Sequence, residues 1–324
     1  MSDTPTTPPA PRSNVLAIPA YVPGRPPTAR PGLTSYKLSS NENPFGPLPG
    51  VLAAAEEAVA HLNRYPDMGS AALYDALGAH LDVPTDRLAV ATGSVGLLYQ
   101  LVAAYCEVGD EVVHAWRSFE AYPIALAASG AVGRAVPLLP DGRHDLDAMV
   151  AAIGERTRVV VVCTPNNPTG PAVTQTELDG FLARVPRDVV VVVDEAYVEF
   201  VRAADPIDGV ATAARWANVV LTRTFSKAYG LAGLRVGYAV GHPETAAALR
   251  AVSLPFGVSA VAQAAAVASL AAHAAMVERV DELVVRRERL LAGLRAQGWP
   301  VPDAQGNFVW LPFPGDPDAT RAFA

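Results

Sequence analysis

The sequence predicts an α/β fold in which helices cover a mostly parallel sheet. Short runs of β-branched residues alternate with helical patterns along the 324-residue chain. The runs are mostly apolar, which is typical of strands that are buried on both faces of a parallel sheet. Hydrophobic residues make up 51% of the chain, which is enough to form the core of one large domain and of a second, smaller domain.

The strands are expected at residues 87–91, 111–115, 158–163, 188–193, 218–222 and 236–240. After Pro255 the pattern changes to one long helix, over about 262–297, and then to a strand at 308–312. The segment 258–275 is apolar, but it contains Gln263 and His273 and continues into the charged run 278–289. We therefore expect a helix packed on the domain and not a membrane span.

Residues 1–13 are expected to form a disordered tail. They contain several prolines among threonines and have no apolar core, so they fit neither a signal peptide nor a membrane anchor.

Composition argues against several classes of partner. The net charge is −7, from 25 basic and 32 acidic residues, and no block rich in Lys or Arg indicates a nucleic-acid surface. Cys106 and Cys163 both lie in apolar runs, which predicts buried thiols in a reducing compartment and no disulfide. We expect a cytoplasmic protein without nucleic-acid or membrane partners.

The most informative stretch of the chain is 224–235, Thr-Phe-Ser-Lys-Ala-Tyr-Gly-Leu-Ala-Gly-Leu-Arg, which contains Lys227. A lysine between an apolar strand and a Gly-rich loop is costly as a free cation, so it needs a partner or a covalent use. An amine that forms a Schiff base meets both demands.

Polar residues follow other predicted strands. Asn166-Asn-Pro-Thr-Gly170 comes after the run 159–163, and Asp194-Glu-Ala-Tyr197 follows five valines. Ligands of parallel sheets collect beyond the carboxyl ends of the strands. Gly93-Ser94, Asn167, Asp194 and Lys227 all fall at or just past such ends, where one cofactor can meet all of them.

Each of these residues also has a purely structural interpretation. Asp194 is poorly solvated unless it meets a cation, but a carboxylate there can also cap the next helical segment. Asn167 suits a turn in Asn-Asn-Pro-Thr-Gly on its own. Ser94 begins a helical run whose free amides suit an anion, and it can equally be a simple N-cap.

The order of these motifs resembles the fold-type I pyridoxal-phosphate (PLP) aminotransferases. Within them it resembles the group that contains histidinol-phosphate aminotransferase and the aromatic amino acid aminotransferases. The resemblance also covers Tyr21-Val-Pro-Gly, the run 40–47 (Ser-Asn-Glu-Asn-Pro-Phe-Gly-Pro), Arg64-Tyr-Pro-Asp and Asn307-Phe-Val-Trp. It implies an N-terminal arm at 14–50, a large PLP-binding domain at 51–257 and a small domain from 258 to 324.

The resemblance implies a role for each matching residue. Lys227 carries the cofactor as a Schiff base and moves the substrate α-proton, and Asp194 pairs with the pyridinium nitrogen. Asn167 and Tyr197 bind the ring oxygen, and Phe119, which is otherwise a core aromatic, stacks on the ring. Tyr21 and Asn167 contact the substrate.

The resemblance also implies a phosphate site. Its residues are Ser94, Val95, Thr224, Ser226, Arg235 and, from a neighbouring subunit, Tyr65. A tyrosine supplied by a neighbour implies a homodimer, whereas alone Tyr65 is only a loop residue.

The loop 93–98, Gly-Ser-Val-Gly-Leu-Leu, lacks the acidic residues that histidinol-phosphate enzymes often carry there. Together with 116–120 and 224–227, it looks more like the aromatic branch. We therefore expect PLP-dependent amino transfer between an aromatic L-amino acid and 2-oxoglutarate. Histidinol-phosphate aminotransferase is the alternative. A threonine-phosphate decarboxylase, which shares the cofactor residues, is less favoured. A non-catalytic PLP-binding regulator is also less favoured, since no DNA-binding module fits before Tyr21.

Family members usually continue after the Asn-Phe strand, with an arginine that binds the substrate carboxylate. Here the sequence ends at Ala324, and Arg321 does not match that arginine. We expect a small domain that is incomplete relative to the family, retained PLP binding and weak transamination.

Overall fold

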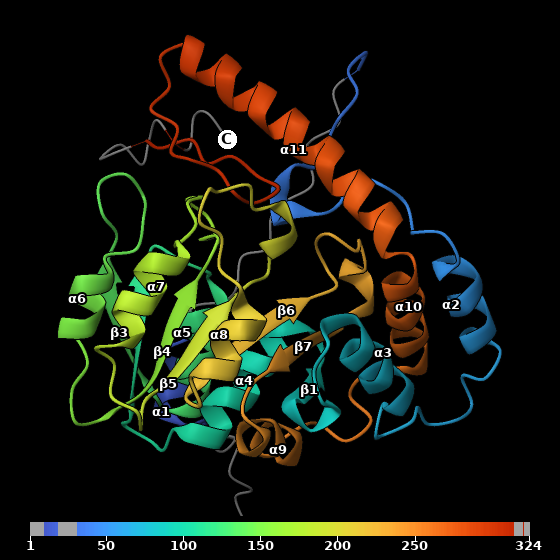
Figure 1. Cartoon of the computed structure of the whole chain (residues 1–324), viewed down its shortest axis with the longest axis horizontal. Helices are drawn as coiled ribbons and strands as arrows, with labels where there is room; N and C mark the ends of the chain where they lie inside the picture. Colours follow the sequence, from blue (N-terminus) through green and yellow to red (C-terminus); the bar gives the residue numbers. More distant parts are fainter. Residues whose placement is uncertain (1–9, 19–30, 314–319, 321–324) are drawn as a thin grey trace, which may run out of the picture.

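The computed structural model describes residues 10–18, 31–313 and 320. Its centre is a seven-stranded sheet in the order β1-β7-β6-β5-β4-β2-β3 (Figure 1). The strands are β1 (Leu88–Ala91), β2 (Glu111–Trp116), β3 (Val132–Pro137), β4 (Thr157–Cys163), β5 (Val190–Asp194), β6 (Val219–Thr224) and β7 (Gly237–Val240). Only β7 runs antiparallel to its neighbours, so the predicted mostly parallel sheet is confirmed.

Each of the six strands expected between residues 87 and 240 is present within two residues of its predicted bounds. Strand β3 was not predicted. It lies at the edge of the sheet, and Val136 is its one buried residue. Such an edge strand lacks the continuous apolar run on which the prediction depends, because Gly133 and Arg134 interrupt it.

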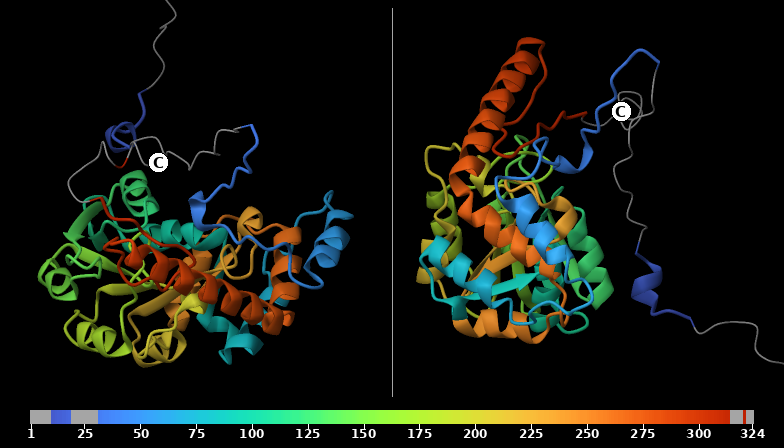
Figure 2. Two further views of the ribbon diagram at one scale, coloured as in Figure 1. Left: turned by 90° about the horizontal axis from the view of Figure 1, so that it is seen from above. Right: turned by 90° about the vertical axis from the view of Figure 1, so that its right-hand side faces the viewer.

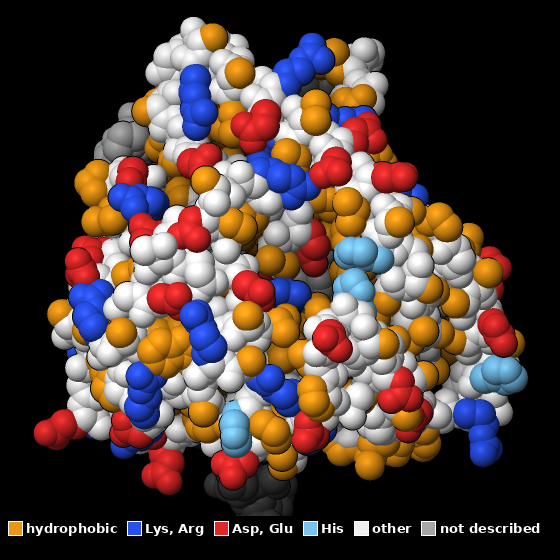
Figure 3. Space-filling view, viewed as in Figure 1, with side chains coloured by type: hydrophobic (Ala, Val, Ile, Leu, Met, Phe, Trp, Pro, Cys, Tyr) orange, Lys and Arg blue, Asp and Glu red, His pale blue; other side chains and the backbone are white. Residues whose placement is uncertain are grey.

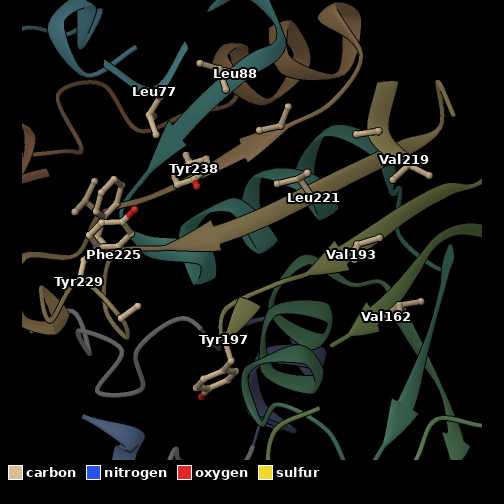
Figure 4. Packing of buried hydrophobic residues seen from close by; sticks show 14 of the residues in the cluster. Leu77, Leu88, Val162, Val193, Tyr197, Val219, Leu221, Phe225, Tyr229 and Tyr238 are labelled. Atoms are coloured by element: carbon tan, nitrogen blue, oxygen red, sulfur yellow. The ribbon is translucent and has the colours of Figure 1, made fainter. Parts of the chain in front are cut away.

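The core lies on both faces of the sheet. In β4, Val159 and Val161 pack in one apolar cluster, and Val160 and Val162 pack in the other. Figure 4 shows part of the second cluster, with side chains of neighbouring strands along one face. Because successive residues of a strand point to opposite faces, a continuous run of valines supplies apolar side chains to both covered faces of the sheet.

Helices cover these two faces. The helices are α1 (Ser13–Leu16), α2 (Val51–Val59), α3 (Ala71–Leu81), α4 (Gly93–Tyr105), α5 (Ala121–Ser129), α6 (Leu146–Ala151), α7 (Gln175–Leu182), α8 (Gly209–Arg215), α9 (Pro243–Ala251), α10 (Ala260–Ala271) and α11 (His273–Ala296). Helices α4, α5 and α9 pack on one face, and α3, α6, α7 and α10 on the other. Figure 2 shows α1 outside this body, beside α5.

The prediction of one long helix over 262–297 is wrong. The segment forms α10 and α11, which meet at an angle of 79°. Ala272 lies between them with a non-helical backbone conformation. The bend lets α10 pack on α2 and α3 while α11 crosses above the sheet (Figure 1), where Arg279 binds the carbonyl oxygen of Gly46. No Gly or Pro marks the break, so the sequence pattern did not reveal it.

The predicted strand at 308–312 is also wrong, since residues 301–313 contain neither helix nor strand. This segment is held by single contacts instead. Asn307 Nδ2 donates to the Asn41 carbonyl oxygen at 3.1 Å, and Arg287 Nη1 donates to that of Gly306 at 3.0 Å. Among the described residues, the region after 258 is therefore helical and irregular rather than α/β.

No single described helix is long and apolar enough to cross a bilayer, although α10 and α11 together pass a test of length and composition despite their bend. On the face shown in Figure 3, Lys and Arg side chains are scattered among acidic ones and do not gather in one patch.

Candidate active site

A cavity of about 500 Å³ opens at the carboxyl ends of β4, β5 and β6, beside the beginning of α4. Ten of the predicted site residues line it. They are Ser94, Val95, Phe119, Asn167, Asp194, Tyr197, Thr224, Ser226, Lys227 and Arg235. Residues more than 130 positions apart in sequence are thus brought together at the edge where a parallel sheet binds its ligands.

Lys227 follows β6 and points its amine at the arm before α2. Its Nζ donates to the carbonyl oxygens of Ser40 at 2.8 Å and Asn41 at 3.3 Å. Burial lowers the pKa of this amine to about 8, with Glu42 acting against the shift and Arg235 adding to it. An amine with this pKa is available as a nucleophile or base near neutral pH.

Asp194 is the last residue of β5, and the alternation along the strand places it on the α4–α5 face. The Oη atom of Tyr122 donates to its Oδ2 at 2.6 Å. Its Oδ1 is buried and has no partner among the described residues. The short 3-10 helix that follows, Val198–Phe200, has no side-chain cap, so the interpretation of Asp194 as a helix cap fails.

Tyr197 and Asn167 are adjacent in the cavity. The Tyr197 hydroxyl accepts hydrogen bonds from Asn167 Nδ2 at 3.3 Å and from Asn41 Nδ2 at 3.0 Å. Burial raises the pKa of Tyr197, so the hydroxyl keeps its proton and remains a donor toward the cavity. The Lys227 amine lies 5.6 Å from the centre of the Tyr197 ring.

The beginning of α4 forms an anion cradle. The helix starts at Gly93, with Thr92 as its N-cap and no side-chain cap, so Ser94 is not the N-cap. The amides of the first turn have no intrahelical partners. Gly93 has φ +80°, and a Cβ there would collide with the Arg235 guanidinium, which places this cation against the helix end.

Hydroxyl groups complete the cradle. Arg235 Nη1 donates to Ser226 Oγ at 3.1 Å, and Thr224 Oγ1 donates to the same oxygen at 3.0 Å. Free helix amides, one guanidinium and two hydroxyls are a donor set suited to a phosphate.

Phe119, which is predicted to stack on the cofactor ring, lies in the cavity, whereas Tyr65, which is predicted to contact a phosphate, lies outside it. Phe119 lines the cavity, with its ring edge-on to Tyr122 at 5.7 Å between centroids. Tyr65 does not line the cavity of its own chain, is 82% exposed and stacks on Phe256 at 4.6 Å. Tyr21 and Arg321 lie outside the described residues.

Tyr122 was not predicted from the sequence. Nor was a role predicted for Asn41, Glu42, Arg117 or Glu120, although all of these residues contact or line the site. Tyr122 follows Phe119 by three residues, and this helical spacing was the available signal. Asn41 lies inside the quoted run 40–47, but only the fold brings it to Tyr197.

Comparison with known proteins gives the family. Residues 34–323 match the model of the aminotransferase class I and II family. The chain is 55% identical over 305 residues to an aromatic amino acid aminotransferase of Streptomyces avermitilis, covering 94% of this chain and 85% of that protein. It is 53% identical over 304 residues to one of Thermobifida fusca, covering 94% and 84%.

Solved structures agree. The crystal structure of histidinol-phosphate aminotransferase from Sinorhizobium meliloti in complex with pyridoxal-5'-phosphate matches with a TM-score of 0.79 and 33% identity, over 83% of this chain and 73% of that one. Aspartate aminotransferase from Thermus thermophilus with maleate matches with a TM-score of 0.75 and 28% identity, over 84% and 75%. The chain, an α/β protein whose strand ends enclose a lysine, a buried aspartate and an anion cradle, therefore belongs to the class I and II aminotransferases.

Proposed function

We propose that this aminotransferase uses PLP to transfer the amino group of an aromatic L-amino acid to 2-oxoglutarate. The observation that carries the proposal is the buried, unpartnered Oδ1 of Asp194 in a cavity that also holds Lys227 and a phosphate-type cradle. A buried carboxylate oxygen without a partner is costly, and a protonated ring nitrogen is the group that would satisfy it.

The donor set fits PLP at each end. Asp194 would hold the ring nitrogen, Asn167 and Tyr197 the ring oxygen, and Phe119 the ring face. The phosphate would be bound by the amides of Ser94 and Val95, the hydroxyls of Thr224 and Ser226, and Arg235. When bound, PLP supplies an electron-poor ring that stabilises negative charge at the substrate α-carbon.

Lys227 supplies the acid–base chemistry of this chain. Its Nζ would anchor the cofactor in the resting enzyme. With substrate bound, the same amine would accept the proton from the substrate α-carbon and later return a proton. Its pKa of about 8 suits both tasks, because the amine changes protonation state near physiological pH.

Lys227→Ala should keep PLP binding in part and abolish turnover. The cradle and Asp194 remain, whereas the only group that moves the proton is gone. Equilibrium dialysis and an amino-transfer assay measure the two effects, and turnover by the variant at the wild-type rate would refute the assignment.

The substrate proposal is supported by the relatives named aromatic amino acid aminotransferase and by the Gly-Ser-Val-Gly loop at 93–96. Phenylalanine, tyrosine and histidinol phosphate should be compared by kcat/KM with 2-oxoglutarate as acceptor. The highest value for histidinol phosphate would favour the alternative instead. Release of carbon dioxide without amino transfer would indicate a decarboxylase.

We further propose a homodimer located in the cytoplasm. Exposed apolar side chains lie around Tyr65, namely Met68 (67%), Leu254 (71%) and Phe256 (41%). A second copy that covers this Tyr65 patch can bring Tyr65 to the partner's phosphate cradle. The described cysteines, Cys106 and Cys163, are both free, which fits a reducing compartment.

A further inference from the structure

Asp194 is held by a residue that no motif singled out. Tyr122, in the first turn of α5, is only 2% exposed, and its Oη donates to Asp194 Oδ2 at 2.6 Å. We infer that Tyr122 is a positioning residue that keeps Asp194 ionised and turns its free oxygen toward the cavity, so that the site selects a cofactor with a protonated ring nitrogen. This inference rests on the proposed use of PLP.

The charge of Asp194 needs such support. Burial raises the pKa of this carboxyl group, and Glu195 adds to the shift. The hydrogen bond from Tyr122 is the largest of the effects that act against it, ahead of those of Thr222 and the Ala196 amide. Among the described residues Asp194 has no ion pair. Until a cationic ring arrives, hydrogen bonds alone therefore stabilise the carboxylate.

Tyr122 is suited to be a permanent donor. A carboxylate can only accept hydrogen bonds, so the proton of this contact belongs to the phenol. Burial and the neighbouring Asp194 raise the pKa of Tyr122 well above its usual value. The phenol thus keeps its proton near neutral pH, and Oδ2 stays occupied while Oδ1 remains free.

The Tyr122 ring is fixed from two sides. It lies edge-on to Phe119 at 5.7 Å and to His114 at 6.0 Å between centroids. The Tyr122 amide donates to the Phe119 carbonyl oxygen at 3.1 Å, so one turn of the chain carries both aromatic rings. The same turn therefore positions Phe119, which is proposed to cover the cofactor ring, and Tyr122, which donates to Asp194.

Core packing is the competing explanation, because Tyr122 also belongs to the apolar cluster under α4 and α5. The two explanations differ in what they predict for ligands. A packing role affects every ligand of the cavity equally. A role through Asp194 affects only ligands whose ring nitrogen can carry a proton.

The test compares PLP with its 1-deaza analogue, in which carbon replaces the ring nitrogen. Tyr122→Phe keeps the ring and removes only the hydroxyl. Dialysis should show that wild type prefers PLP, and that the variant binds PLP roughly tenfold more weakly, the effect of losing one hydrogen bond to a charged group. Affinity for the deaza analogue should change less than twofold. Tyr105→Phe, on α4 outside the cavity, should leave both affinities unchanged.

Two further measurements guard against a merely destabilised variant. In an Asp194→Asn background, Tyr122→Phe should no longer change the ratio of the two affinities. In the single variant, PLP affinity should begin to fall at a higher pH on acidification than in wild type, because the lost donor lets the Asp194 carboxyl group protonate more readily.

The outcomes separate the two proposals. Equal losses for both ligands, or an effect of Tyr122→Phe that persists without the Asp194 charge, would reduce Tyr122 to core packing. Failure of the wild-type protein to bind PLP would instead overturn the proposed function. Wild-type preference for PLP that Tyr122→Phe leaves intact would overturn this inference alone.

Discussion

At the scale of single residues, Lys227 shows how an amine is kept reactive. Its Nζ donates hydrogen bonds to two main-chain carbonyl oxygens, and no carboxylate forms an ion pair with it among the described residues. Neutral acceptors stabilise the ammonium less than a carboxylate does, so burial prevails and the pKa falls.

Reductive labelling measures this directly. The sequence contains two lysines, Lys37 and Lys227, so Lys37 is an internal control. With PLP and borohydride, the pyridoxyl group should be found on Lys227 by peptide mapping. The labelling rate should rise as pH passes through about 8, where the amine loses its proton. Preferential label on Lys37, or a rate that is flat from about pH 7 to 9, would contradict this account.

Glu199 is a second residue with a shifted pKa, outside the cavity. Its Oε2 is buried without a partner, and burial raises the pKa of its carboxyl group to about 7. In the unfolded chain the pKa is near 4.5. The folded protein therefore binds the proton of Glu199 more tightly than the unfolded chain does. The contribution of this proton to the free energy of unfolding is fully present below about pH 4.5 and is lost as pH rises to about 7.

Glu199→Gln removes this titration. Relative to the variant, wild type should lose up to about 3 kcal/mol of unfolding free energy between pH 4.5 and 7. Urea unfolding of both proteins at several pH values measures the difference. A difference that does not vary with pH would show that Glu199 ionises normally in the folded state.

At the scale of elements, the join between β1 and α4 depends on Gly93. A Cβ at this position meets the Arg235 guanidinium, and φ is +80°, which disfavours any other residue. Gly93→Ala should lower the unfolding free energy by about 1 kcal/mol or more. Because Arg235 must move, affinity for PLP should fall roughly tenfold.

Gly180→Ala is the matched control. Gly180 lies in α7, and a Cβ there meets nothing within 4 Å. This variant should keep its affinity for PLP and gain up to about 1 kcal/mol of stability from helix propensity. Calorimetry measures the stability of both variants, and dialysis measures their affinity for PLP. Equal PLP affinities of Gly93→Ala and Gly180→Ala would argue against the phosphate cradle at Gly93.

The elements also show what sequence can predict. The strands could be predicted because a short apolar run between turns is typical of a buried strand. The site could be predicted because polar residues stand at the carboxyl ends of those runs. The α10–α11 break was missed because helix propensity is uniform through this alanine-rich segment, and only packing against α2 and α3 selects Ala272. Tyr122 was missed because a single tyrosine in an apolar helix is ordinarily a core residue.

At the scale of the whole molecule, the Tyr65 patch predicts a dimer. Light scattering should give about twice the chain mass of 33.9 kDa. Leu254→Glu should shift the protein toward monomer and weaken PLP binding, since a charge at an apolar interface is costly and Tyr65 then leaves the partner's site. Val285→Glu, at a 68% exposed position on α11, should change neither. A monomeric wild type that binds PLP fully would refute the dimer.

The valines before Asp194 have a consequence for how the chain finds its alignment. Sliding a strand by one residue reverses which side each side chain faces, and a uniform valine run gives no hydrophobic penalty for doing so. Asp194 and Glu195 break this degeneracy. Asp194 must meet Tyr122 on one side, and Glu195 must meet Arg223, 2.7 Å away, on the other. The polar pair at the end of β5 therefore fixes the alignment of a strand whose valines do not. One of its two contacts, between Asp194 and Tyr122, also belongs to the candidate active site.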